Sequence, residues 1–154
     1  MKPNYIIYIW LAIFVSVFVW VLLFRGDDTD FARVEFGGVE MVIEYAMTSE
    51  ERERGLGDRE EISENFGMLF IFEEDDRYGF WMKEMQIPID IFWLDEEMRV
   101  VSSAHKVSPD TYPTSFYPVV SARYALETAS GFAERHAVAT GTKLMFIKTP
   151  WFVE

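Results

Sequence analysis

The sequence predicts a mainly β, α+β domain that is compact and partly closed like a β-barrel, with one or two short helices and one transmembrane helix in front of it. Three observations predict this architecture. An apolar segment without any charge occupies residues 5–24. The rest of the chain alternates short apolar runs with turn-forming residues, which is typical of many short strands. Apolar residues make up 50% of the chain and aromatic residues 17%, enough for a folded core.

The apolar segment reads YIIYIWLAIFVSVFVWVLLF. Twenty helical residues span about 30 Å, the hydrocarbon thickness of a bilayer. A cleaved signal peptide would have a shorter apolar region, about 7–15 residues, and small residues at its cleavage site, whereas this segment is bulky to its end. The sequence therefore predicts a transmembrane anchor at residues 5–24 that binds the lipid bilayer, with residues 1–4 as a stub.

The basic residues around the anchor predict its orientation. Lys2 precedes the span and Arg25 follows it, so the positive-inside count is nearly balanced. A short basic stub before the span favours an N-terminus inside the cell. We therefore expect a single-pass protein of the cell membrane, with its globular domain on the extracytoplasmic side.

Residues 25–31 are predicted to form an acidic linker, and residues 32–154 one globular domain. All 26 acidic residues but only thirteen of the 14 basic ones follow the apolar segment, so that part carries a formal charge of −13. The scattered Arg52, Arg54 and Arg59 form no basic patch, and the chain is therefore not expected to bind nucleic acid. It has no cysteine, which excludes disulfides, thiolate metal sites and cysteine nucleophiles.

The first half of the domain predicts a hairpin, a short helix and a central strand. Residues 32–44 alternate loosely around two glycines, which is typical of a hairpin with a glycine turn. Thr48-Ser-Glu-Glu51 is a capping box, and the helix that it begins is expected to end at Gly55. Residues 67–72 are apolar on both faces and predict a strand in the middle of the structure, followed by a turn at residues 73–76.

The second half predicts strands at residues 79–82, 87–94, 99–104, 124–128 and 143–148, with a hairpin turn at 95–97 and a helical turn or two at 131–138. Residues 105–123 contain three prolines, too many for a central element. Because long irregular segments in compact domains usually have a function, this loop is expected to border the main cleft, near Trp81 and Asp90. The alternative is that this loop lies on the surface and its aromatic rings cover the end of the barrel.

Five motifs occur in an order that resembles the domain of unknown function 192 family. They are Glu51-Arg52 with Arg54-Gly55-Leu56 and Arg59, then Asn65-Phe-Gly-Met-Leu-Phe70, Phe80-Trp-Met-Lys83, Ile87-Pro-Ile-Asp90-Ile-Phe92 and Tyr124-Ala-Leu-Glu127. The resemblance covers roughly residues 33–148 and implies a small, mainly β domain, often exported or membrane-tethered, without an established activity. Family members typically have Asn-Thr where this chain has Glu84-Met85, so a site that uses those two positions is altered here.

Asp90 and Glu127 are the most suggestive acids, because each lies in an apolar strand where a lone carboxylate is costly to bury. Together they could act as an acid–base pair or bind a hard cation such as calcium, which makes a hydrolase-type enzyme one function class. Asp90 could instead form a structural ion pair, with Arg59 or Arg123 as its partner, or cap backbone amides.

The other candidate ligand-binding residues are Arg59, Trp81, Lys83 and Tyr112. Trp81, Trp93 and the loop with Tyr112 and Tyr117 could form a flat aromatic platform for a sugar or peptide, but the two tryptophans are interpreted first as core residues of their strands. The sequence contains no motif for a metal, a cofactor, a nucleotide loop or a serine nucleophile. It therefore favours a binding or accessory module that recognises a small molecule, a glycan or an envelope protein, and leaves open whether the chain is an enzyme.

Overall fold

The computed structural model describes Trp10, residues 31–148 and Phe152. Apart from Trp10, the predicted stub, the anchor at residues 5–24 and the linker up to residue 30 lie outside the described residues. In the part of the chain that the structure describes, no helix is long and apolar enough to cross a membrane.

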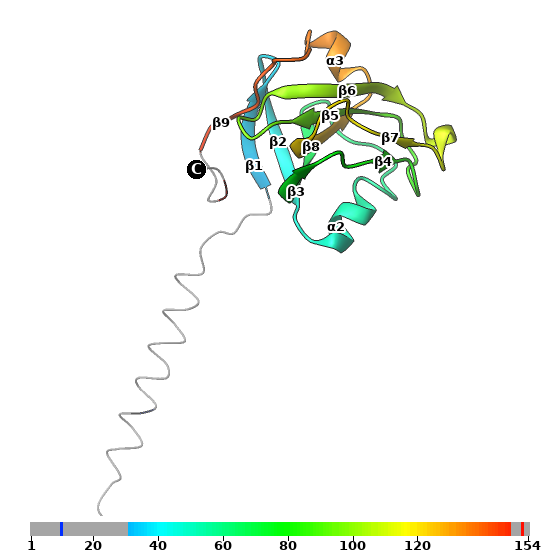
Figure 1. The fold of residues 1–154 in the computed structure, drawn as a ribbon, viewed down its shortest axis with the longest axis horizontal. Coiled ribbons are helices and arrows are strands. Elements are labelled where there is room, and N and C mark those ends of the chain that lie inside the picture. The colour runs from blue at the N-terminus through cyan, green and yellow to red at the C-terminus, as the bar shows by residue number, and fades with distance from the viewer. Residues whose placement is uncertain (1–9, 11–30, 149–151, 153–154) are drawn as a thin grey trace, which may run out of the picture.

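Within the described residues the chain forms a mainly β domain with two short α-helices (Figure 1). The elements are β1 (Phe31–Phe36), β2 (Val39–Ala46), α2 (Ser49–Arg54), β3 (Phe66–Asp76), β4 (Phe80–Trp81), β5 (Ile89–Leu94), β6 (Val100–Val107), a 3-10 helix (Pro109–Thr111), β7 (Ser115–Phe116), β8 (Ala122–Ala129), α3 (Phe132–Arg135) and β9 (Met145–Phe146). The predicted mainly β fold is thus confirmed.

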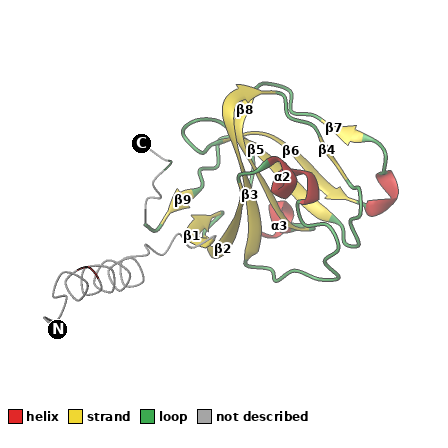
Figure 2. Cartoon of the chain, turned by 90° about the horizontal axis from the view of Figure 1, so that it is seen from below, coloured by secondary structure: helices red, strands yellow, loops and turns green. Residues whose placement is uncertain are grey.

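Seven strands form one sheet in the order β6-β5-β8-β3-β2-β1-β9, while β4 and β7 pair separately. The pairs are antiparallel except for β2 with β3, which is parallel. In Figure 1, α3 lies above the sheet and α2 below it, while β4 and β7 lie beside one another on one side of the sheet in Figures 1 and 2. The middle of the sheet, where β5, β8 and β3 adjoin, is therefore covered from both sides.

The sheet does not close into a barrel, and in this respect the prediction is only partly met. Instead, the chain from residue 139 to residue 147, which contains β9, links the start of β6 at one edge to β1 near the other. The Val100 amide donates to Thr142 and the Leu144 amide to Met98, each at 2.9 Å, at the β6 edge. Beyond them, Ile147 donates to the Arg33 carbonyl at 3.0 Å, at the β1 edge. We call residues 139–147 the strap.

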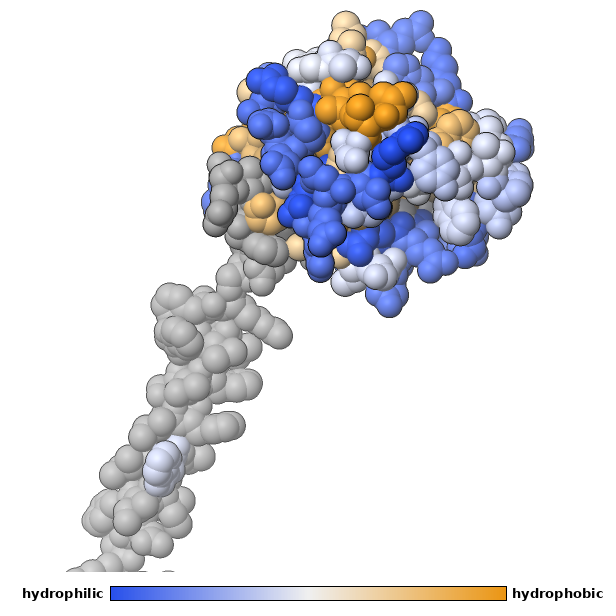
Figure 3. All heavy atoms as spheres, in the orientation of Figure 1, coloured by the Kyte–Doolittle hydropathy of each residue, from blue (hydrophilic) through white to orange (hydrophobic). Residues whose placement is uncertain are grey.

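Alternate residues of the central strands face two separate cores. All six residues of β5 are buried, and Phe92 and Leu94 belong to the core that packs on α3, whereas Ile91 and Trp93 belong to the core on the α2 side. This alternation follows from the period of two in a strand. The face of the molecule seen in Figure 3 is mostly hydrophilic, with one compact hydrophobic patch.

Local signals predicted several elements well. The hairpin around Gly37-Gly38 and the capping box of Thr48 and Glu51 are both present. The turn expected at residues 73–76 is wrong, because β3 continues to Asp76, which pairs with Ala122. Those charged side chains are exposed, so a paired backbone can continue past the core without burying charge. The proline-rich segment is also more regular than expected, since β6 extends to Val107 and a 3-10 helix and β7 follow.

Candidate functional site

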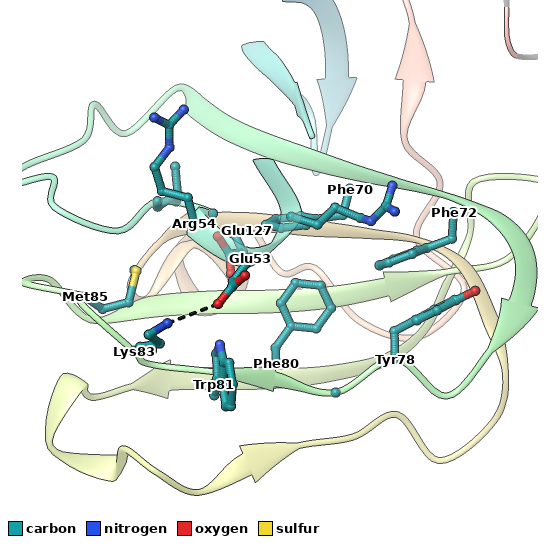
Figure 4. A pocket seen from close by; sticks show the side chains of 14 residues that line it. Glu53, Arg54, Phe70, Phe72, Tyr78, Phe80, Trp81, Lys83, Met85 and Glu127 are labelled. Atoms are coloured by element: carbon teal, nitrogen blue, oxygen red, sulfur yellow. Dashed lines mark hydrogen bonds and ion pairs between the residues drawn. The ribbon is translucent and has the colours of Figure 1, made fainter. Parts of the chain in front are cut away.

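A cavity of about 250 Å³ lies between the end of α2, β3, β4 and β8 (Figure 4). Its lining combines the backbone of Gly55, aromatic rings from β3 and β4, and the carboxyl group of Glu127 from β8. None of its lining residues is a serine, threonine, histidine or cysteine. The cavity therefore joins an apolar, aromatic wall to one acidic group.

The sequence around α2 determines where this helix begins and where it ends, and its C-terminal end lies beside Glu127. The Thr48 side chain accepts from the Glu51 amide at 3.2 Å, while the Glu51 carboxylate accepts from the Thr48 amide at 2.8 Å. Gly55 ends the helix with φ 52° and ψ −134°, a conformation that side chains disfavour. A Cβ at Gly55 would lie 3.3 Å from both Glu127 Oε2 and Phe70. A side chain at this position would therefore crowd both the carboxyl group and the ring.

Glu127 is a buried acid in the middle of the sheet. It pairs with Met68 of β3 and Ile91 of β5, and only 4% of its surface is exposed. Its Oε2 atom has no hydrogen-bond partner within the described structure. Burial raises the pKa of this carboxyl to about 8, although the Leu56 amide and the Arg59 guanidinium act in the opposite direction. At neutral pH the group is therefore mostly protonated and can donate a hydrogen bond.

Aromatic rings form the wall beside Glu127. Phe80 meets Phe70 edge to face with ring centroids 4.8 Å apart, and it meets Trp93 at 5.8 Å in the same way. Phe72 and Tyr78 stack at 3.6 Å. These contacts join β3, β4 and β5 and hold the wall in one arrangement.

Charged side chains surround the cavity, and two of the three cations are already engaged. Lys83 Nζ lies 3.1 Å from Glu53 Oε1, and this hydrogen bond raises the pKa of Lys83, which keeps the ammonium charged. Arg52 donates to the backbone carbonyls of Met47 and Ile71. Arg54 extends away from the cavity in Figure 4.

Trp81 lies at the edge of the cavity and is 43% exposed, so it is not a core residue. Tyr112 meets it with ring centroids 6.3 Å apart. The proline-rich segment also reaches the cavity through β7, which pairs with β4, and through Tyr117, whose ring would lie 2.5 Å from a Cβ at Gly79. This segment therefore adjoins the cavity on the side of Trp81, as expected, but the cavity does not include Asp90, which was expected beside it.

Asp90 lies elsewhere. It is fully buried, and its carboxylate accepts from the amides of Lys106 at 2.7 Å, Gly131 at 3.0 Å and Ala133 at 2.8 Å. Because Asp90 pairs with Thr128 while Glu127 pairs with Ile91, the two acids point to opposite faces of the sheet. The structure therefore does not bring Asp90 and Glu127 together as an acid–base or cation-binding pair.

The arginines proposed as partners of Asp90 are engaged with other acids. Arg59 lies 2.7 Å from Glu44, and Arg123 lies 3.8 Å from Asp75. Asp90 caps backbone amides instead of forming an ion pair. Among the residues that the structure describes, no group of three or more histidine, aspartate or glutamate side chains is placed to hold a metal ion.

The structure thus gathers part of the predicted set. Glu127, Trp81 and Lys83 line the cavity, Tyr112 contacts Trp81, and Arg59 acts on Glu127 from outside the lining. The sequence reasoning missed the contribution of α2, which supplies Arg52 and Glu53, and of Gly55 directly after it. The signal was present, since these positions belong to or adjoin the first motif quoted for the family resemblance.

Comparison with known proteins places this geometry in a family. Two crystal structures share the fold. One is a candidate transcription regulator from Sinorhizobium meliloti 1021, 24% identical, with a TM-score of 0.69 and alignment over 75% of this chain and 92% of that one. The other is a protein of unknown function from Novosphingobium aromaticivorans DSM 12444, 29% identical, with a TM-score of 0.67 over 74% and 82% of the two chains.

Comparison with curated proteins gave no match. The family model described as "Uncharacterized ACR" matches residues 32–146, which include every residue that lines the cavity. The chain belongs to the domain of unknown function 192 family.

Proposed function

We propose that this chain is a binding module that holds a small molecule, or one unit of a glycan, in the cavity under α2. The observation that carries the proposal is Glu127 Oε2, a buried polar atom without a partner in the cavity wall. Buried polar atoms without partners are rare in native proteins and costly, because they lose their hydrogen bonds to water. A ligand that enters the cavity and bonds to this atom removes the cost.

The size and composition of the cavity support a small ligand. Sites for drug-sized molecules usually measure about 300–1,000 Å³ and combine apolar walls with a few polar groups. At about 250 Å³, with rings on one side and a carboxyl group on the other, this cavity suits a ligand of about one ring. A protein segment would instead contact the outer rim, where Trp81 and Tyr112 lie.

A binding function accounts for the lining better than hydrolysis does. Glu127 is the buried acid of the cavity, while Glu53 is at its edge and bonded to Lys83. Asp90, the second acid of the hydrolase hypothesis, faces the other side of the sheet. This geometry therefore argues against a hydrolase that uses Asp90 and Glu127 together.

A thermal-shift screen of the full-length chain against sugars, amino acids, amides and nucleotides tests the proposal. We expect at least one compound to raise the melting temperature of the wild type. Gly55→Ala should abolish that shift, since its Cβ enters the space beside Glu127 Oε2 and Phe70. Gly38→Ala is the matched control, because Gly38 also has a positive φ, 75°, but nothing within 4 Å of a Cβ.

Two outcomes would contradict this function. One is a screen in which no compound stabilises the wild type. The other is a compound whose stabilisation survives Gly55→Ala unchanged, because such a compound binds outside the cavity.

We propose further that the module is tethered to the cell membrane with its domain on the extracytoplasmic side. The support is the sequence of residues 5–24, which are apolar and long enough for one span. The protein should stay with membranes in alkaline carbonate, and protease added to intact cells should digest the domain. Complete protection of the domain in intact cells would reverse the orientation, and release by carbonate would exclude the anchor.

A further inference from the structure

The carboxyl group of Glu127 offers a ligand a particular kind of contact. Oε2 receives no hydrogen bond from the described residues, so the proton of the neutral acid is best placed on this oxygen. Gly55 and Glu127 both line the cavity, and a Cβ at Gly55 would approach Oε2 to 3.3 Å. A protonated carboxyl presents one O–H donor together with acceptor capacity. Its natural partner is an oxygen acceptor, such as the carbonyl of an amide.

The charged groups around Glu127 argue against a charged ligand. Those around it are Arg52 and Glu53 of α2, Arg59 after α2 with its partner Glu44 on β2, and Tyr78 and Lys83 on either side of β4, while the side chain of Arg54 extends away from the cavity. A cation entering the cavity would pass Arg52 and Lys83. An anion would meet a neutral acid, while Lys83, Arg52 and Arg59 are engaged with Glu53, backbone carbonyls and Glu44. Neither charge has a free counter-charge inside.

The aromatic walls of the cavity determine which kind of ligand body fits beside the carboxyl group. Phe70 and Phe80 meet edge to face, and Trp81 continues this aromatic surface to solvent. A flat ring buried there replaces water with dispersion contacts, which a fully hydrated polar chain would not gain.

We infer that the cavity selects a neutral ligand of about one ring that presents an amide-type carbonyl oxygen to the protonated carboxyl of Glu127. The inference rests on the proposed binding function and names its ligand class. It follows that binding requires the proton on Glu127 and is lost once that proton leaves.

Benzamide, benzamidine and benzoate provide a matched set of probes, since they share one ring and nearly one shape but are neutral, cationic and anionic. Saturation-transfer NMR on the full-length chain at pH 6.5 and pH 9.5 would compare them. We expect a benzamide signal at pH 6.5 and little signal from the other two. Because the pKa of Glu127 is about 8, about thirtyfold fewer molecules carry the proton at pH 9.5, and benzamide binding should fall about tenfold or more.

Glu127→Gln separates this effect from a general effect of pH. Its carboxamide stays neutral at both pH values, so benzamide binding should no longer depend on pH. Glu60→Gln makes the same exchange at an exposed position outside the cavity and should leave the pH dependence as in the wild type. If Glu127→Gln does not fold, the pH dependence with which the three probes bind to the wild type still tests the inference.

Three results would overturn the inference. Benzamidine that binds more tightly than benzamide, most of all at pH 9.5, would make the cavity a cation site. Benzoate as the tightest probe would make it an anion site. If none of the three probes gives a saturation-transfer signal, one-ring ligands with an amide-type carbonyl are excluded. The proposed function would then still be judged by its own screen, since a different compound lost on Gly55→Ala would keep the binding module and discard only this ligand class.

Discussion

Glu127 is the residue at which the sequence departs most from what the fold alone needs. Its neighbours across the sheet are Met68 and Ile91, and an apolar side chain would satisfy that surface without the cost of a carboxyl group. Proteins break such local rules mainly at functional or strained sites. Gly55, directly beside it, has a strained backbone conformation, and this also is typical of a functional site.

The raised pKa of Glu127 has a consequence for stability that can be measured. The unfolded chain loses this proton near pH 4.5, while the folded chain keeps it to about pH 8. Between these values the folded state binds more protons, so the free energy of unfolding falls as pH rises, by about 1.4 kcal/mol per pH unit from this group. Glu127→Gln carries no titrating proton. Its stability relative to the wild type should therefore rise between pH 4.5 and 8 and stay level above.

Urea denaturation of both proteins at pH 4.5, 6, 7 and 8.5 checks this prediction. The difference between the two free energies of unfolding is the quantity to follow, because other titrating groups cancel in it. A constant difference over this range would mean that the pKa of Glu127 is not raised. Glu127 would then be ionised at neutral pH and could not donate a hydrogen bond to the ligand.

At the scale of elements, Asp90 caps the start of α3, although it belongs to β5 and not to the helix. This four-residue helix begins after Gly131, which has no side chain to cap it. Asp90, on β5, accepts from the Gly131 and Ala133 amides at the start of α3 and also from the Lys106 amide near the end of β6. One buried carboxylate thus joins two strands and a helix, which explains its burial without a ligand.

The comparison of Asp90 with Glu127 shows what sequence reasoning could and could not supply. Both are acids in apolar strands, so the pattern identified both as unusual. Their roles differ because the register of β5 against β8 places them on opposite faces, and a register of non-neighbouring strands is not written in local sequence. The capping box and the glycine hairpin were predictable because their contacts span only a few residues. The cavity was not, because α2 and β8 are distant in sequence.

At the scale of the whole domain, the strap joins the two sides of the seven-stranded sheet. It donates to the Arg33 carbonyl in β1 and to the Met98 carbonyl just before β6, and its β9 residues pair with β1, so it connects the two sides of the sheet. Leu144 in its middle is buried in the core that packs on α3. Unpaired sheet edges invite association with other chains. The strap therefore covers the start of β6 and the outer side of β1, and the Leu144 side chain anchors it.

Leu144→Ala should accordingly loosen both edges together. Removal of this buried side chain, which is 1% exposed, should cost about 2–5 kcal/mol of unfolding free energy by lost burial and cavity formation. The neighbouring Met145→Ala is the matched control, because Met145 is 47% exposed and should cost far less. Hydrogen exchange adds the test of coupling: the amides of Val100 and Ile147, which bond across the two ends of the strap, should both exchange faster in Leu144→Ala. Faster exchange at one end alone would mean that the strap is two independent contacts rather than one connecting element.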